Sequence, residues 1–196
     1  MTLSGPTSGG ETAHSTSAKN EKLNEKLKEI RLLLLDVDGV MTDGRITYTE
    51  AGVESKSFNV KDGLGIRLAM DAGIRVGIVT ARTSEALRHR CRNLAIDLVF
   101  DGVKNKRAVL DDIVATTGVS AHRIAFMGDD LLDLPLMRCV GLSVAVADAH
   151  DLLIEHADMV TIRRGGHGAV REVCESLLKA QGAWERIMDR YVNDEK

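Results

Sequence analysis

The chain has 196 residues, of which 44% are hydrophobic, and its net charge of −3 comes from 26 basic and 29 acidic residues, so one domain with a full core is expected. There is no basic run and only 3% of the residues are aromatic, so we do not expect nucleic acid as a partner. No apolar stretch approaches the ~20 residues of a membrane span and the N-terminus lacks a signal-peptide pattern, so we do not expect a membrane as a partner. Three widely spaced cysteines form no disulfide or metal pattern, which favours a reduced, cytoplasmic protein.

The N-terminal part of the chain divides into a tail and a helix. Residues 1–19 are rich in Ser, Thr and Gly without periodicity, and we expect a disordered tail there. From Asn20, the residues Leu23, Leu27 and Ile30 recur at helical spacing and predict a short amphipathic helix. We expect the domain to span residues 20–180, followed by a C-terminal tail over 181–196.

The central part predicts an α/β fold with one decoration. A buried strand over 32–35 is followed by a β-hairpin formed by RITYT (45–49) and VESKSF (53–58). Strands then alternate with helices, which predicts a three-layer Rossmann-like sandwich around a parallel sheet. The expected strands are 74–80, 97–100, 123–128, 142–146 and 159–162, and the expected helices are 63–72, 83–94, 104–117, 131–138, 149–156 and one starting near 168.

Two carboxylates follow the first strand in the sequence DVDGVMTDG (36–44). Residues two apart on a strand point the same way, so Asp36 and Asp38 can both face a site at the carboxyl end of the sheet, where open parallel sheets bind ligands. Gly39 lets the backbone turn and approach an anion. The plainer alternative is a strand that ends in a polar turn.

Two other segments carry groups suited to phosphate. Thr80 ends the strand 74–80 and has a hydroxyl that can donate to a phosphate oxygen, although it could equally cap the following helix. Lys106 lies near the start of the helix 104–117, where a cation opposes the helix dipole; the alternative is a solvated surface lysine.

A cluster of acids follows the strand 123–128. Asp129, Asp130 and Asp133 would repel one another without a cation, and clustered hard oxygen ligands favour Mg²⁺. A favourable interaction with a helix N-terminus explains one of these acids but not all three.

This order of groups, DxD, Thr, Lys and GDD, resembles the haloacid dehalogenase superfamily. More specifically, five segments resemble the small, capless family of 3-deoxy-D-manno-octulosonate 8-phosphate phosphatases. They are DVDGVMTDG, FNVKDGLGIR (58–67), MGDDLLDLP (127–135), GLSVAVADAH (141–150) and RGGHGAVREVCE (164–175).

The resemblance implies a Mg²⁺-dependent phosphatase with an aspartyl-phosphate intermediate, a homotetramer and a place in lipopolysaccharide precursor synthesis. It implies that Asp36 is the nucleophile, Asp38 the acid and base, and Thr80 and Lys106 the neutralising groups. Mg²⁺ would be held by Asp36, the Asp38 carbonyl and Asp129, with Asp130 and Asp133 close behind. The residues expected to contact the substrate are Gly39, Ala81, Arg82 and Arg67.

Two alternatives stay open at this point. A related branch acts on nine-carbon sugar-acid phosphates and tends to have Glu where Arg82 stands, so Arg82 favours the eight-carbon substrate, whose carboxylate an Arg fork can bind. The other alternative is a non-catalytic module of the same fold that only builds an oligomer, and the presence of every expected catalytic residue type argues against it.

Overall fold

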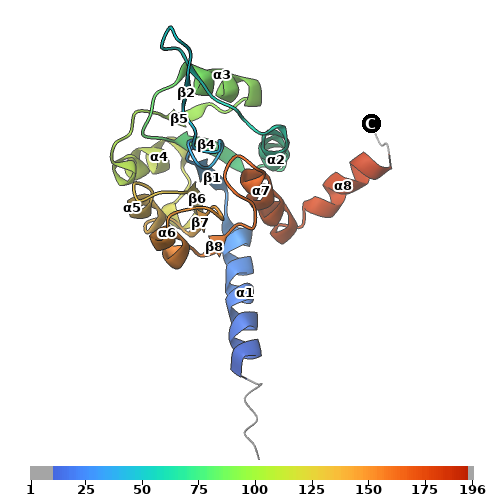
Figure 1. Cartoon of the computed structure of the whole chain (residues 1–196). Coiled ribbons are helices and arrows are strands. Elements are labelled where there is room, and N and C mark those ends of the chain that lie inside the picture. Colours follow the sequence, from blue (N-terminus) through green and yellow to red (C-terminus); the bar gives the residue numbers. More distant parts are fainter. Residues whose placement is uncertain (1–10, 194–196) are drawn as a thin grey trace, which may run out of the picture.

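The structure, a computed structural model, describes residues 11–193 and has a six-stranded parallel sheet at its centre (Figure 1). The strand order is β5-β4-β1-β6-β7-β8, so successive crossovers run outward from β1 in both directions. The six strands are β1 (Leu32–Leu35), β4 (Arg75–Val79), β5 (Leu98–Phe100), β6 (Ile124–Gly128), β7 (Leu142–Ala145) and β8 (Met159–Val160). The expected α/β fold is confirmed.

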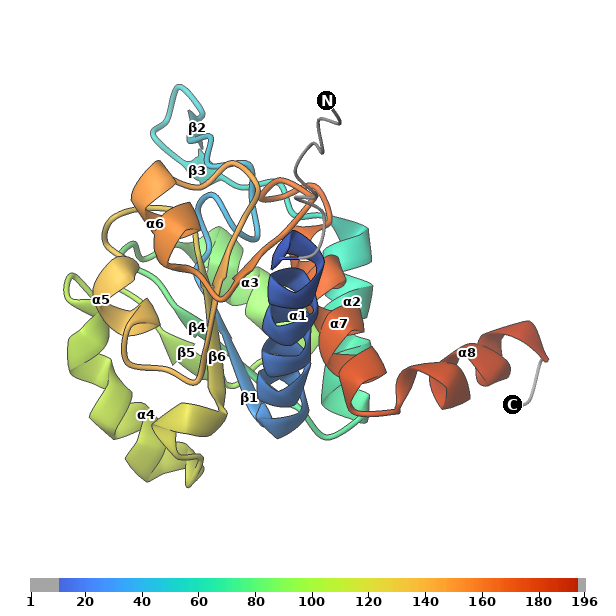
Figure 2. The same ribbon diagram turned by 90° about the horizontal axis from the view of Figure 1, so that it is seen from below.

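Helices cover both faces of this sheet. Figure 2 shows α1, α2 and α7 packed side by side on one face, with α4 and α5 away from them. None of the helices within residues 11–193 is both long and apolar enough to cross a membrane. The α-helices are α1 (Glu11–Glu29), α2 (Val60–Asp71), α3 (Glu85–Leu94), α4 (Leu110–Thr117), α5 (Leu134–Met137), α6 (Asp151–His156), α7 (Ala169–Ala180) and α8 (Trp184–Val192), and two 3₁₀ helices are η1 (Lys106–Val109) and η2 (Ala121–Arg123).

The strand β1 forms the middle of the core because both of its faces are apolar. Its four leucines are fully buried, as expected for a parallel strand covered by helices on both sides. Leu35 lies opposite Ile78 of β4 and Met127 of β6, so the carboxyl ends of these three strands are level. The residues that follow them, at 36, 80 and 129, are therefore brought to one edge of the sheet.

The hairpin is present but shorter than predicted. Its antiparallel strands are β2 (Thr47–Tyr48) and β3 (Glu54–Ser55), and they form a separate two-stranded sheet above the main one (Figure 1). Ile46, Tyr48 and Val53 are exposed, as expected for apolar residues that leave the domain. Phe58 differs, since it packs against the core with the Arg90 guanidinium 5.6 Å from its ring centre.

Both ends of the chain contain more helix than the sequence predicts. The helix α1 begins at Glu11 rather than Asn20, so residues 11–19 of the expected disordered tail are helical in this structure, and residues 1–10 lie outside the described part of the chain. At the other end, the segment 181–196 contains α8, which projects away from the body (Figure 1). The predicted helix 104–117 begins at Lys106 and its first turn is the 3₁₀ helix η1.

The glycines of GGHG (165–168) serve close packing. A Cβ on Gly165 would lie 1.6 Å from the carbonyl oxygen of Gly39, and the Gly166 amide donates to the carbonyl of Val40 at 2.9 Å. The loop before α7 thus lies backbone against backbone on the loop after β1. Gly168 is the N-cap of α7, in agreement with the helix expected to start near residue 168.

Candidate active site

A cavity of about 310 Å³ opens at the carboxyl ends of β1, β4 and β6. It gathers nearly all of the polar groups predicted from the sequence, although they come from four separate segments. Its lining residues are Asp36, Asp38, Gly44, Thr80, Ala81, Arg82, Lys106, Asp129, Asp130, Leu132 and Asp133. The acids and cations of this cavity are therefore the candidate active site.

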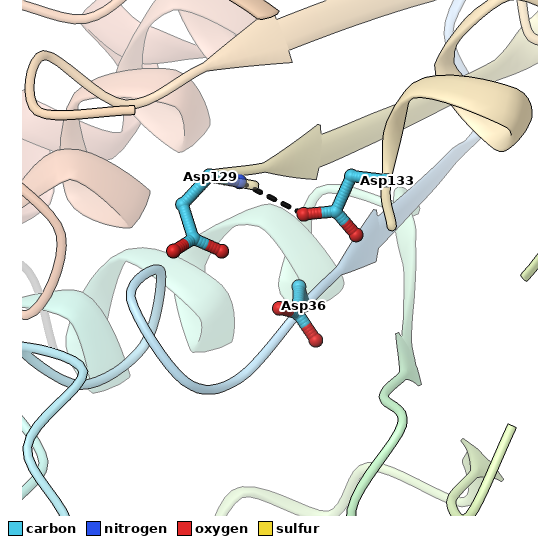
Figure 3. A group of neighbouring side chains, drawn as sticks. All are labelled: Asp36, Asp129 and Asp133. Carbon is cyan, nitrogen blue, oxygen red and sulfur yellow. Dashed lines mark hydrogen bonds between the residues drawn. The ribbon is translucent and has the colours of Figure 1, made fainter. Parts of the chain in front are cut away.

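Three carboxylates converge in this cavity, one from the end of β1 and two from the loop after β6 (Figure 3). One oxygen from each of Asp36, Asp129 and Asp133 lies within 4.8 Å of the others. Gly39 makes room for this arrangement, because a Cβ there would lie 1.9 Å from Oδ2 of Asp129. With a φ of +89°, Gly39 also has a backbone conformation that other residues rarely adopt.

Lys106 lies between two of these carboxylates. Its ammonium is 2.8 Å from Oδ1 of Asp36 and 2.5 Å from Oδ1 of Asp133, and its side chain is only 2% exposed. A lysine so deeply buried is stable as a cation only when it is paired. The solvated-surface alternative for Lys106 is therefore wrong.

Both oxygens of Asp133 already accept hydrogen bonds within the protein. Its Oδ1 accepts from Lys106, and its Oδ2 accepts the backbone amides of Asp129 at 2.9 Å and Asp130 at 3.3 Å. Asp133 therefore shapes the loop that carries Asp129. This geometry agrees with its predicted place behind the metal ligands.

Burial and mutual repulsion favour the protonated forms of these acids. Burial, with a further contribution from Asp133, raises the pKa of Asp36 to about 6 against the opposing effect of Lys106. Burial, followed by the charges of Asp36 and Asp133, raises the pKa of Asp129 to about 8. Ionisation is thus most strongly disfavoured at Asp129, where a cation would have the largest effect.

This donor set fits a hard divalent cation. Within residues 11–193, Lys106 pairs with Asp36 and Asp133, but no basic side chain forms an ion pair with Asp129. Carboxylate oxygens are the ligands that Mg²⁺ prefers. A divalent cation beside Asp129 would compensate the negative charge of the three carboxylates that the single positive charge of Lys106 does not neutralise. The side chains of Asp36 and Asp129 are the ones available to hold it.

The Asp38 side chain turns away from this cluster toward the hairpin. Its Oδ1 accepts from the ammonium of Lys56, and its Oδ2 lies 3.5 Å from Nε of Arg82. Glu54 completes a ring, since its carboxylate lies 3.2 Å from Lys56 and 2.5 Å from Arg82. We call Asp38, Lys56, Glu54 and Arg82 the charge ring.

The sequence reasoning missed two members of the charge ring. Glu54 and Lys56 stand on a short hairpin where charged residues are usually solvated, yet their side chains are 16% and 2% exposed. Their spacing of two residues was the available signal, because it places both on the same face of an extended segment. Burial alone would raise the pKa of Glu54, but Arg82 and Lys56 outweigh it and lower that pKa.

The remaining predicted residues are placed as follows. Thr80 is buried and lines the cavity, as does its neighbour Ala81. Asp130 lies at the rim and is exposed. Arg67 does not line the cavity, because its guanidinium contacts the carbonyl of Asn93 on α3, so the geometry gives no support for substrate contact there.

Residues 90–172 match the model of the haloacid dehalogenase-like hydrolase family. Over 157 residues the chain is 50% identical to the 3-deoxy-D-manno-octulosonate 8-phosphate phosphatase KdsC of Escherichia coli strain K12, covering 80% of this chain and 84% of that protein. The chain belongs to this phosphatase family. The predicted family resemblance is thereby confirmed.

Solved structures of the family agree with the fold and bear on the metal. The phosphatase of Moraxella catarrhalis, in complex with a magnesium ion, a phosphate ion and a KDO molecule, is 35% identical with a TM-score of 0.85, over 87% of this chain and 98% of that one. The cobalt-bound phosphatase of Haemophilus influenzae is 43% identical with a TM-score of 0.79, over 81% and 93% of the two chains. The predicted divalent metal is in keeping with both family members.

Proposed function

We propose that this protein is a Mg²⁺-dependent phosphatase that hydrolyses 3-deoxy-D-manno-octulosonate 8-phosphate to the free sugar acid and inorganic phosphate. The observation that carries the proposal is the convergence of Asp36, Asp38, Lys106 and Asp129 in one cavity of a chain that is 50% identical to a phosphatase of this substrate. The enzyme's place would be in lipopolysaccharide precursor synthesis. The cysteine pattern supports a cytoplasmic location.

Asp36 is the proposed nucleophile. One carboxylate oxygen of Asp36 forms a bond to phosphorus while the bond from phosphorus to the sugar oxygen breaks, which gives an aspartyl-phosphate. Lys106, 2.8 Å from this carboxylate, holds it in place and would offset the negative charge of the phosphoryl oxygens together with the Thr80 hydroxyl. Mg²⁺, held by the side chains of Asp36 and Asp129 and the carbonyl of Asp38, would reduce the repulsion between an anionic nucleophile and an anionic phosphate.

Asp38 is the proposed acid and base. It protonates the sugar oxygen as that oxygen leaves, and it then takes a proton from the water that attacks the aspartyl-phosphate. The second step releases inorganic phosphate and restores the Asp36 carboxylate. Its position supports this assignment, because Asp38 lines the same cavity as the nucleophile Asp36.

Arg82 is the proposed partner of the substrate carboxylate. It follows Thr80 by two residues, lines the same cavity and is more exposed than the other members of the charge ring, at 39%. In this structure its guanidinium contacts the carboxylate of Glu54, and this pairing supports Arg82 as a group that binds carboxylates. Ala81 lines the same cavity, whereas Gly39 is not among its lining residues and acts by leaving room for Asp129.

Release of phosphate from the octulosonate phosphate, with and without Mg²⁺, tests the proposal. We expect Mg²⁺-dependent turnover that Asp36→Asn abolishes while the folded state persists by circular dichroism. A panel that includes a nine-carbon sugar-acid phosphate and a small aryl phosphate establishes the substrate preference. Full activity of Asp36→Asn, or the same rate in excess chelator, would contradict the mechanism.

We also propose that the protein is a homotetramer assembled through its hairpins. Ile46, Tyr48 and Val53 are 45%, 58% and 62% exposed on a small two-stranded sheet that is marginal by itself. Association of hairpins would cover this apolar surface and the free strand edges. Light scattering should give four times the chain mass, and a fully active monomer would refute the assembly.

A further inference from the structure

We propose that Lys56, carried by the hairpin, is a positioning residue that fixes the orientation of the Asp38 carboxylate for proton transfer. The inference rests on the proposed function of Asp38 as acid and base. It adds to that function a residue outside the sheet edge where the other groups stand.

The burial of Lys56 is the first observation. A lysine on a short hairpin can reach water at no cost, yet this side chain is 2% exposed and its ammonium contacts two carboxylates, Asp38 and Glu54. Removing an ammonium from water is unfavourable unless well-placed anions compensate it. The hairpin is therefore folded so that this cation lies over the catalytic loop.

The division of the Asp38 oxygens is the second observation. Lys56 donates to Oδ1, whereas Oδ2 is buried, accepts no hydrogen bond among the described residues and lies on the side of Arg82. With Oδ1 held, the carboxylate cannot rotate freely. Oδ2, which accepts no hydrogen bond within residues 11–193 and is covered by Arg82 3.5 Å away, is the oxygen left to exchange a proton with the leaving oxygen or with water once Arg82 turns to the substrate carboxylate. Proton transfer needs heavy atoms about 2.6–3.2 Å apart, so a loose carboxylate is a poor acid and base.

Glu54 has a different part in the same ring. It contacts both cations but not Asp38, so it holds Lys56 and Arg82 in register without touching the reacting groups. Loss of the Glu54 charge should leave the contact between Lys56 and Asp38 in place. Glu54→Gln is therefore the matched control within the ring, and Lys61→Met, at an exposed lysine on α2, is the control for loss of one positive charge.

The test uses three substrates that differ in leaving group and in sugar contacts. The octulosonate phosphate and propyl phosphate have poor leaving groups that need a proton, whereas p-nitrophenyl phosphate releases a stable phenolate. Propyl phosphate lacks the sugar. For Lys56→Met we expect kcat/KM to fall about 10²-fold on both alkyl phosphates, the lower end of what general acid–base catalysis contributes, and by about threefold or less on the aryl phosphate.

Each alternative predicts a different pattern. A loss confined to the octulosonate phosphate would show that Lys56 binds the sugar acid, and equal losses on all three substrates would show a structural role; either result overturns the proposal. Asp38→Asn should give the same ranking of substrates with larger losses, and the two controls should leave the ratio of the propyl phosphate rate to the aryl phosphate rate unchanged.

Stability and function are kept apart by two further measurements. Thermal melts report whether Lys56→Met folds. If it does not, Lys56→Arg keeps the charge with a different shape, and a smaller but still selective loss on the alkyl phosphates is expected.

If the unmodified protein hydrolyses none of the substrates, the proposed function fails. If Asp38→Asn is selective for leaving group and both Lys56 variants are not, only the present inference fails.

Discussion

Replacing Gly39 by Ala should remove a metal ligand without touching an acid. The added Cβ would lie 1.9 Å from Oδ2 of Asp129, so the carboxylate must retreat by about 1.5 Å to reach the 3.4 Å of an ordinary contact. Mg²⁺ requires oxygen ligands at about 2.0–2.1 Å, so a ligand displaced that far is lost. We expect Mg²⁺ affinity to fall at least ~10-fold, or ~1.4 kcal/mol.

Gly44→Ala is the matched control. Gly44 also has a positive φ, +77° against +89° for Gly39, but the atoms nearest to its added Cβ are 3.6 Å away. Both variants carry backbone strain of about 1–2 kcal/mol, which corresponds to roughly 2–8 °C in Tm for a domain of this size. Only Gly39→Ala should lose Mg²⁺ affinity.

Calorimetric titration of Mg²⁺ into the two purified variants measures the difference directly. Thermal melts in chelator establish that the two proteins are similarly destabilised before metal is added. If Gly39→Ala binds Mg²⁺ as tightly as Gly44→Ala, then Asp129 is not a ligand, or its loop moves without cost, and the reasoning is refuted.

Three other predictions concern the charges of the cavity. Since the folded pKa of Asp129 is raised to about 8, the metal-free protein should lose stability as pH rises from about 4 to 8. Asp129→Asn should therefore be more stable than the parent at pH 8 but not at pH 4. Melts in chelator that show an equal difference in Tm between the two proteins at both pH values would contradict this. Lys106→Met leaves two buried carboxylates unpaired and should cost about 3–5 kcal/mol, with part of the loss recovered by adding Asp133→Asn; an unchanged Tm in the single variant would argue against the pairing. Arg82→Glu should reduce kcat/KM on the octulosonate phosphate far more than on an aryl phosphate, because only the former has a carboxylate to repel; equal losses would place Arg82 at the phosphate instead.

The sequence was most informative where chemistry and strand position coincide. The four leucines of β1 predict a buried strand, and the acids after β1 and β6 had to meet once those strands were parallel and adjacent. Lys106 could be placed only by resemblance, since nothing in its neighbourhood shows that it turns inward to Asp36.

Each feature that the sequence did not predict has a physical reason. The start of α1 was predicted too late because its first residues lack apolar periodicity, although the structure extends the helix to Glu11. The close packing of the GGHG segment could not be predicted, because Gly165 is required by the backbone of Gly39 in a loop distant in sequence. Lys56 and Glu54 were overlooked because their partners lie in other segments, and charge on a hairpin is ordinarily solvated.

The hairpin also has a consequence for how strand register is specified. Thr47 pairs with Ser55 and Tyr48 with Glu54, and the hairpin has little apolar burial to hold that pairing. A shift of one residue would turn Glu54 and Lys56 outward and bring their neighbours over the cavity. The ion pairs with Asp38 and Arg82 oppose such a shift, so the active site itself selects the alignment of the hairpin, and misaligned chains would be folded but inactive.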